Sequence, residues 1–122
     1  MEQENRLKPK LFTMESENII SLTDSNFDEE TYESELPALV MFGAERCAQC
    51  KEELPMIEEI AGEYKGRVKV CWIEVDQYPT LQQRLRLRGI PNLLLFKDGA
   101  VEGRLGGLRE KDEVVEMLEN VI

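Results

Sequence analysis

Two cysteines separated by two residues are the clearest candidates for chemistry in this chain. Cys47 and Cys50 follow the apolar run ALVMF at 38–42 and open a segment with helical periodicity. At the start of a helix, a step of three residues can leave the two Cα atoms about 5 Å apart, which a disulfide tolerates. The spacing is therefore compatible with a redox pair, with two metal ligands, or with two small residues that lie close by chance.

The position of each cysteine predicts a different role. Cys47 lies at the helix start, where unpaired amides and the helix dipole favour a thiolate. In a redox pair, Cys47 would attack a substrate disulfide and form a mixed disulfide. Cys50, one turn into the helix and covered by the fold, would then displace the substrate.

Composition excludes several other classes of function. The chain has 122 residues, 42% of them hydrophobic, which suits one domain with a packed core. Its net charge of −10 argues against nucleic acid or an anionic membrane as partner. No apolar run approaches the roughly 20 residues of a membrane helix, and the first residues lack the apolar centre of a signal peptide. We therefore expect a cytoplasmic monomer.

The remaining titratable residues weigh against metal chemistry. The chain has no histidine, which removes Ser-His and Cys-His catalysis together with the commonest metal ligand. A third cysteine, Cys71, lies in an apolar strand and should point away from the pair, since neighbouring strand residues face opposite sides. Three thiolates are one fewer than the four ligands that zinc usually takes. We expect no metal.

The elements around the cysteine pair are predicted to form a mixed sheet covered by helices. Residues 1–16 are expected to be a flexible extension, and 17–122 the domain. Apolar runs predict strands at 18–22, 38–42, 68–75, 92–96 and 100–105, the last two joined at Asp98-Gly99. Helices are expected from a cap at Asp24 or Ser25 to about 35, from the cysteines to about 64, over 80–87, and over about 109–121. The order strand–helix–strand–helix–strand–helix–strand–strand–helix predicts an α/β domain with helices flanking a mixed central sheet.

Over residues 17–122 the chain resembles thioredoxins. The matching segments are IISLTDSNFDEE, ALVMFGAERCAQCK with Pro55 following, VDQYP, and RGIPNLLLFKDGAVEGRLGG, with no evident gap. The resemblance implies the thioredoxin fold, with strand order 1-3-2-4-5. It also implies an electron carrier without a bound cofactor, which reduces disulfide-containing proteins and is recharged by a thioredoxin-reductase-type donor.

The resemblance also assigns residues to a substrate groove. Ile90-Pro91 matches the family's cis-proline loop, which lies against the cysteines and blocks metal capture there. By resemblance, the backbone of Ile90 hydrogen-bonds an extended substrate segment, as an added strand would. Gly89, Ile90, Gly106 and Gly107 match positions around the apolar docking groove.

Two departures from the family pattern affect the site. The chain reads R-C-A-Q-C where thioredoxins usually read W-C-G-P-C, so Arg46 places a cation beside Cys47 that should favour its thiolate. The residues between the cysteines help to set the redox potential in this superfamily, and a shift of about 30 mV is already tenfold in equilibrium. The potential is therefore left open.

The second departure concerns the layer below the cysteines. Met41 and Trp72 stand where thioredoxins have a buried aspartate and its lysine partner, and Gly43 replaces a tryptophan. Because both charges are replaced together, no uncompensated buried charge remains. We expect the Trp72 indole to fill part of the space at Gly43. The family aspartate helps to deprotonate the resolving cysteine, so we expect slower resolution by Cys50.

These substitutions leave a second interpretation open. A thioredoxin-fold module could use the groove to bind proteins while cycling weakly or not at all. The changes at Met41, Gly43, Arg46 and Trp72 favour it, whereas the intact cysteines and Ile90-Pro91 oppose it. Trapping of partners through Cys47 by a Cys50→Ser variant would distinguish the two.

Overall fold

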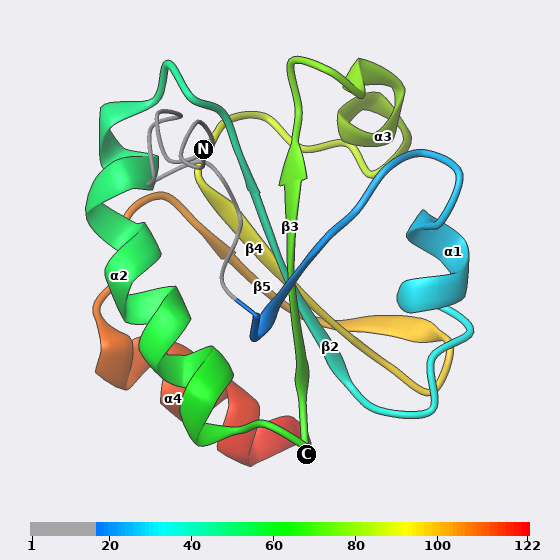
Figure 1. Cartoon of the computed structure of the whole chain (residues 1–122), viewed down its shortest axis with the longest axis vertical. Coiled ribbons are helices and arrows are strands. Elements are labelled where there is room, and N and C mark those ends of the chain that lie inside the picture. The colour runs from blue at the N-terminus through cyan, green and yellow to red at the C-terminus, as the bar shows by residue number, and fades with distance from the viewer. Residues whose placement is uncertain (1–16) are drawn as a thin grey trace, which may run out of the picture.

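A five-stranded mixed sheet forms the centre of the chain (Figure 1). The computed structural model describes residues 17–122, so the expected extension at 1–16 lies outside the described residues. In spatial order, β1, β3 and β2 pair in parallel. The next strand, β4, is antiparallel to β2, and β5 is antiparallel to β4. This arrangement confirms the predicted fold class and strand order. The strands are β1 (Ile19–Ser21), β2 (Ala38–Gly43), β3 (Lys69–Glu74), β4 (Asn92–Lys97) and β5 (Ala100–Gly106).

Helices cover both faces of this sheet. Figure 1 shows α2 and α4 on one face and α1 and α3 on the other. Each face has its own apolar cluster: one includes Ile57 and Val114 beneath α2 and α4, the other Phe27 and Leu81 beneath α1 and α3. None of the described helices combines the length and apolar character that crossing a bilayer requires. The helices are α1 (Phe27–Glu30), α2 (Ala48–Glu63), α3 (Pro79–Arg84) and α4 (Lys111–Val121).

The register of the sheet brings four loops to one edge. Gly43, the last residue of β2, pairs with Glu74, the last of β3. Next to Gly43, Phe42 pairs with Asn92, the first residue of β4, and Asn92 pairs with Gly106, the last of β5. The segments that follow β2, β3 and β5, and the one that precedes β4, therefore meet at this edge. They contain the cysteines and the residues assigned to the groove.

The first helix is much shorter than predicted. A helix from Asp24 or Ser25 to residue 35 was expected, and that prediction is wrong because α1 covers four residues. Instead of a cap at Asp24 or Ser25, the Thr23 hydroxyl accepts the amides of Ser25 and Asn26 at 3.2 and 3.3 Å, and the Asn26 side-chain oxygen accepts the Thr23 N–H at 2.7 Å. At the other end, the Thr31 hydroxyl donates to the Phe27 carbonyl at 2.7 Å, and the Thr31 backbone leaves the helix (φ −118°, ψ −79°). Such local side-chain bonds compete with the helix.

Two further helix boundaries differ from the predictions. The helix expected over 80–87 ends at Arg84, and Arg86 has the left-handed φ of 58°, which a continuing helix does not allow. The last helix begins at Lys111 rather than about 109. Glu110 and Glu113 form a reciprocal capping box at its start, which satisfies amides that a helix leaves unpaired.

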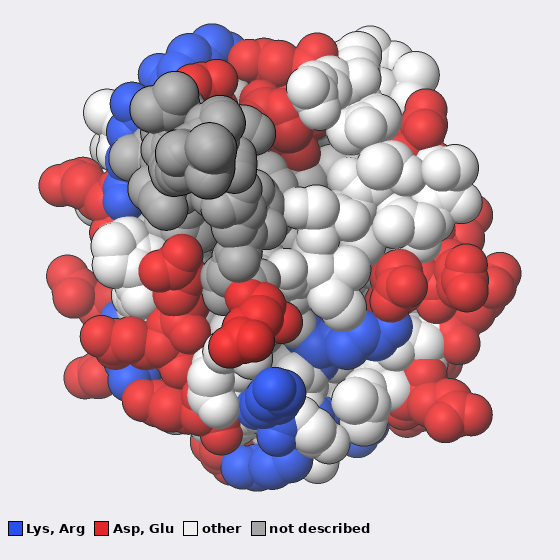
Figure 2. Space-filling view, in the orientation of Figure 1, with Lys and Arg blue, Asp and Glu red and all other residues white. Residues whose placement is uncertain are grey.

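Acidic side chains gather over α1, at the right of the face shown in Figure 2. Two of them are paired with cations from other elements. Arg84 donates to Asp28 at 2.7 Å, and Lys69 donates to Glu30 at 2.6 Å. These ion pairs connect the short helix to α3 and β3.

Candidate active site

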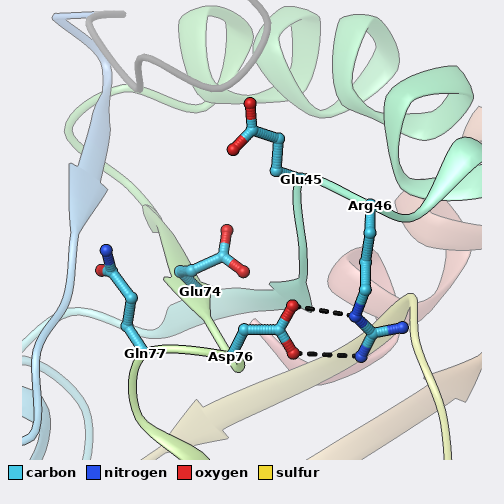
Figure 3. A pocket seen from close by; sticks show the side chains of 5 residues that line it. All are labelled: Glu45, Arg46, Glu74, Asp76 and Gln77. Atoms are coloured by element: carbon cyan, nitrogen blue, oxygen red, sulfur yellow. Dashed lines mark hydrogen bonds and ion pairs between the residues drawn. The ribbon is translucent and has the colours of Figure 1, made fainter.

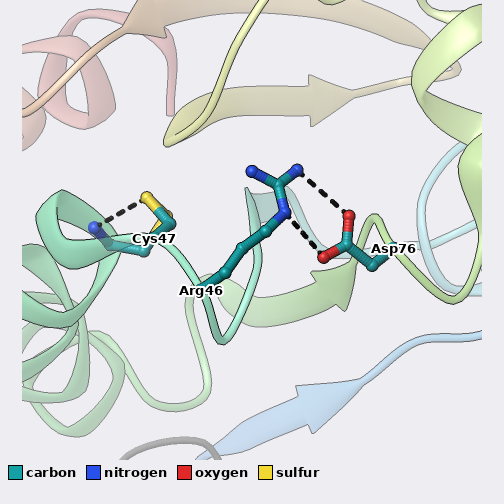
Figure 4. The surroundings of a disulfide bond; sticks show 4 residues. Arg46, Cys47 and Asp76 are labelled. Carbon is teal, nitrogen blue, oxygen red and sulfur yellow. Dashed lines mark hydrogen bonds and ion pairs between the residues drawn. A yellow bond between two sulfur atoms is a disulfide. The ribbon is translucent and has the colours of Figure 1, made fainter.

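The cysteine pair forms the start of α2. Cys47 caps the helix with an extended backbone (φ −96°, ψ 109°), and its Sγ accepts the Cys50 N–H at 3.1 Å. A disulfide joins the two residues, whose Cα atoms are 5.2 Å apart (Figure 4). Cys47 is partly exposed and Cys50 is buried. The exposed sulfur therefore lies where backbone amides favour an anion.

The space below Cys50 is filled by Trp72. A Cβ atom on Gly43 would lie 2.8 Å from Trp72 Cη2 and 2.9 Å from Cys50 Sγ, so no side chain fits there without a shift. Trp72 pairs with Met41 in the sheet register, and both are buried in the same cluster as Cys50. The indole thus occupies the space at Gly43, as the sequence led us to expect.

The loop before β4 lies at the same edge of the sheet. The Ile90–Pro91 peptide bond is cis, as the resemblance implies, and the Pro91 carbonyl accepts the Gly107 N–H at 2.9 Å. Ile90 is half-buried and packs against both apolar clusters, as Cys47 does. Gly89, Gly106 and Gly107 are exposed beside them. Gly107 has a φ of +81°, which favours glycine.

Arg46 forms an ion pair on the other side of Cys47. Its Nε and Nη2 donate to the two carboxylate oxygens of Asp76 at 2.8 and 3.1 Å (Figure 4). The guanidinium holds the pKa of Asp76 below its ordinary value. We expected Arg46 to favour the Cys47 thiolate; the carboxylate of Asp76 offsets the charge of Arg46 and reduces this effect. Asp76 was not among the candidate residues, although its place just after a buried strand was a signal for it.

An open pocket of about 410 Å³ surrounds this ion pair (Figure 3). Its lining carries three carboxylates and one cation, so the surface beside Cys47 is negative overall. Burial raises the pKa of Glu74 above its ordinary value. The lining residues are Glu45, Arg46, Glu74, Asp76 and Gln77.

Comparison with known proteins identifies the family. The Thioredoxin family model matches residues 18–120. A thioredoxin of Pseudomonas aeruginosa is 36% identical over 104 residues, which cover 85% of this chain and 96% of that protein. A thioredoxin of Allochromatium vinosum is 39% identical (86% and 98% covered), and one of Thiocapsa roseopersicina 41% identical (71% and 96% covered).

The chain belongs to the thioredoxin family. Family membership and the Cys47–Cys50 disulfide make it a thiol–disulfide oxidoreductase that acts as a protein-disulfide reductase. The predicted family, fold and general activity are confirmed.

The third cysteine of this thioredoxin-family chain lies apart from the pair. Cys71 is free and fully buried in the cluster beneath α1 and α3, on the opposite face of the sheet from Trp72. Burial raises the pKa of its thiol to about 12. Within residues 17–122, no group of three or more His, Cys, Asp or Glu side chains is arranged to hold a metal ion. The predicted orientation of Cys71 is confirmed.

A buried carboxyl near the cysteines was missed by the sequence analysis. Glu53 lies one turn after Cys50 and is only 1% exposed. Its Oε2 accepts the backbone N–H of Arg109 at 2.9 Å, and burial raises its pKa to about 7. The signal was present in the sequence, because residue 53 shares the buried side of α2 with Leu54 and Ile57.

Proposed function

We propose that Cys47 is the attacking cysteine of this oxidoreductase and Cys50 the resolving cysteine. The Cys47 thiolate attacks one sulfur of a substrate disulfide, so a Cys47–substrate bond forms while the substrate disulfide breaks. The departing substrate sulfur takes up a proton. Cys50, after losing its proton, attacks Cys47 Sγ and releases the second substrate thiol. Two electrons pass to the substrate, and the Cys47–Cys50 disulfide remains.

One observation carries this assignment of roles. Cys47 is partly exposed at the helix N-terminus and accepts an amide there, whereas Cys50 is fully buried beneath it. A large substrate can therefore approach Cys47 Sγ, while Cys50 reacts only with a sulfur already bound at Cys47.

The groove residues complete the proposal. Arg46, Gly89, Ile90, Pro91, Gly106 and Gly107 contact the substrate segment, and Met41 and Trp72 support the cysteines by packing. In support, these segments meet at one sheet edge, and Ile90 and Cys47 pack on the same clusters. An extended segment bound there would hydrogen-bond the backbone of Ile90, as in strand addition.

The partners follow from the family and the chemistry. The substrates are disulfide-containing proteins, and a separate thioredoxin-reductase-type donor restores the two thiols, so no bound cofactor is needed. We place this monomer in the cytoplasm, where thiols are kept reduced; the buried free thiol of Cys71 fits such a compartment. Residues 17–122 are proposed to fold as the domain, in keeping with the family match over 18–120.

A redox titration with trapping tests the assignment. The chain is equilibrated in dithiol/disulfide buffers of known potential, and free thiols are alkylated and located by mass spectrometry. We expect one reversible two-thiol step at Cys47 and Cys50, retained in the matched control Cys71→Ser. Cys50→Ser should accumulate a mixed disulfide with an oxidised substrate protein through Cys47, and Cys47→Ser should not.

Two results would contradict the proposal. The absence of a reversible two-thiol step would leave only a binding module. A mixed disulfide formed by Cys47→Ser but not by Cys50→Ser would reverse the two roles.

A further inference from the structure

Glu53 places a carboxyl on the otherwise apolar side of α2. Among residues 17–122, Thr31 and Glu53 are the polar or charged residues whose side chains are buried. The Thr31 hydroxyl is satisfied by the Phe27 carbonyl at 2.7 Å. A buried carboxyl is costly unless its oxygens are hydrogen-bonded, so its partners indicate what it does.

Glu53 holds a loop rather than another side chain. Its Oε2 accepts the Arg109 backbone N–H at 2.9 Å, while Oε1 is buried and has no hydrogen-bond partner among the described residues. Arg109 in turn donates from Nε to the Gly106 carbonyl at 2.9 Å. The next residue, Gly107, donates its N–H to the Pro91 carbonyl at 2.9 Å. A series of hydrogen bonds thus connects α2, the loop after β5 and the proline loop.

The loop has few other means of staying in place. Gly106, Gly107 and Leu108 are exposed, and a Cβ on Gly107 would have no atom within 4 Å. Gly106 is the last residue of β5 and pairs with Asn92, so beyond the sheet the segment is positioned mainly by its hydrogen bonds. One end is held by Pro91 and the other by Glu53.

We propose that Glu53 is a positioning residue, which holds the Gly106–Arg109 loop against the cysteine helix and so fixes one wall of the substrate groove. The inference rests on the proposed function, which assigns Gly106 and Gly107 to that groove. Glu53 contacts neither cysteine sulfur in this role. It acts through the loop and matters only for substrates long enough to lie along the groove.

The two cations that share a pocket with Glu53, Arg109 and Lys111, are bound to other groups, so the Arg109 backbone N–H remains the main polar contact of Glu53. Lys111 is occupied by Glu59 and Glu63, at 3.1 and 2.8 Å, and the Arg109 side chain by Gly106 and Glu113. An ionised carboxylate accepts an N–H more strongly than a neutral acid does. The charged residues that line the adjoining pocket are Glu52, Glu53 and Glu59 from α2, and Arg109, Glu110 and Lys111 from the start of α4.

The test compares two substrates and two variants. Reduced protein is mixed with a disulfide-bearing peptide that spans the groove, or with hydroxyethyl disulfide, which has no peptide backbone. Glu53→Met removes the acceptor and should slow reduction of the peptide by roughly tenfold, the equivalent of one lost hydrogen bond. It should leave reduction of hydroxyethyl disulfide within about twofold. Glu53→Gln keeps an acceptor oxygen and should retain both rates.

Amide hydrogen exchange provides a readout that does not depend on activity. Exchange at Gly107 and Arg109 should accelerate in Glu53→Met and stay slow in Glu53→Gln. The amide of Val75, which donates to the Gly43 carbonyl at 2.9 Å on the other side of the cysteines, is the internal control. If Glu53→Met does not fold, Glu53→Asp replaces it, because the shorter side chain withdraws the carboxylate without removing its charge.

The outcomes separate the two proposals. Equal slowing of both substrates, or no slowing of either, with a reactive wild-type protein, would overturn the positioning role and leave the oxidoreductase intact. Unchanged exchange at Arg109 would overturn it as well. A wild-type protein that reduces neither substrate would contradict the proposed function itself.

Discussion

Two carboxyls flank the cysteine pair and respond to their surroundings in opposite ways. Asp76 is exposed, accepts two hydrogen bonds from Arg46, and has a lowered pKa. Glu53 is buried, accepts one backbone N–H, and has a pKa raised to about 7. Burial raises the pKa of Glu53 because it penalises the charged form, whereas the hydrogen bonds and the positive charge of Arg46 lower the pKa of Asp76 because they favour the charged form.

The same contrast holds for the two sides of the site. Beside Cys47 lies a rim made of the exposed residues Glu45, Arg46 and Asp76 and the partly buried Glu74. Below Cys50 lies a buried layer, made of Met41, Gly43 and Trp72, with Glu53 one helical turn further on. Changes in the buried groups should alter stability, because packing and desolvation act there in full. Changes in the rim should have little effect on stability, because solvent and salt screen its charges. They should act instead on the reactivity of Cys47, which lies beside these charges.

The largest effect is expected from a charge placed in the buried layer. Met41→Asp should lower the free energy of unfolding by about 3–5 kcal/mol, since it buries a carboxylate with no partner. Adding Trp72→Lys should recover part of this loss and accelerate resolution by Cys50. Recovery stays incomplete because the indole beside Gly43 is lost. Urea unfolding and stopped-flow reduction measure the two effects; a fully stable single variant would contradict this account.

Glu53 should give the fold a pH-dependent stability. Its pKa is raised from 4.5 to about 7, so its contribution is fully present below about pH 4.5 and is lost as the pH rises through about 7. From about pH 5 to about pH 8, wild type should lose about 1–3 kcal/mol relative to Glu53→Gln. Urea unfolding across this range measures the difference. Glu52→Gln, an exposed neighbour, controls for the change in net charge, and a difference that is constant with pH would contradict the prediction.

A single added methyl group tests the close packing below Cys50. Gly43→Ala would bring a Cβ within 2.8 Å of Trp72 Cη2. We expect a loss of about 1–3 kcal/mol, typical of overpacking. Gly62→Ala is the matched control, because its Cβ would meet nothing closer than 3.8 Å and it lies inside α2. That control should gain about 0.5–1 kcal/mol; equal stability of the two variants would show that the layer has room.

The smallest effect is expected at the rim. Asp76→Asn removes a negative charge beside Cys47 and releases Arg46, so Cys47 should become reactive toward iodoacetamide at a slightly lower pH. The shift should shrink as salt is added, since the residues are exposed. Asp98→Asn, at the opposite end of β4, makes the same charge change and should have no effect. A shift toward higher pH in Asp76→Asn would contradict this assignment.

The sequence predicted most of the fold because its signals agreed. Continuous apolar runs marked β2, β3 and β4, and Asp98-Gly99 marked the hairpin. The failure at α1 had a local cause: side-chain bonds between Thr23 and Asn26 delay the start of the helix, and the Thr31 hydroxyl bonds the Phe27 carbonyl where it ends. Such bonds depend on rotamers and backbone turns, which the residue pattern does not specify.

The site was predicted where it depends on local spacing and missed where it depends on contacts between distant residues. Cys47 and Cys50 were found from three residues of separation. The place of Trp72 near Gly43, on the neighbouring strand, was predicted only because the resemblance to thioredoxins showed that a tryptophan is replaced by Gly43. The Arg46–Asp76 pair joins residues 30 positions apart, and Glu53–Arg109 joins residues 56 apart. These pairings depend on which loops meet at the sheet edge, and only the assembled fold determines that.

The burial of Cys71 gives the molecule an internal reporter of its own opening. With a pKa of about 12 and no exposed surface, this thiol is unreactive toward alkylating reagents as long as the cluster beneath α1 and α3 stays closed. It becomes reactive when that part of the sheet opens. The rate at which Cys71 is labelled under native conditions therefore measures how often the cluster beneath α1 and α3 opens. This rate does not depend on the redox state of the other two cysteines.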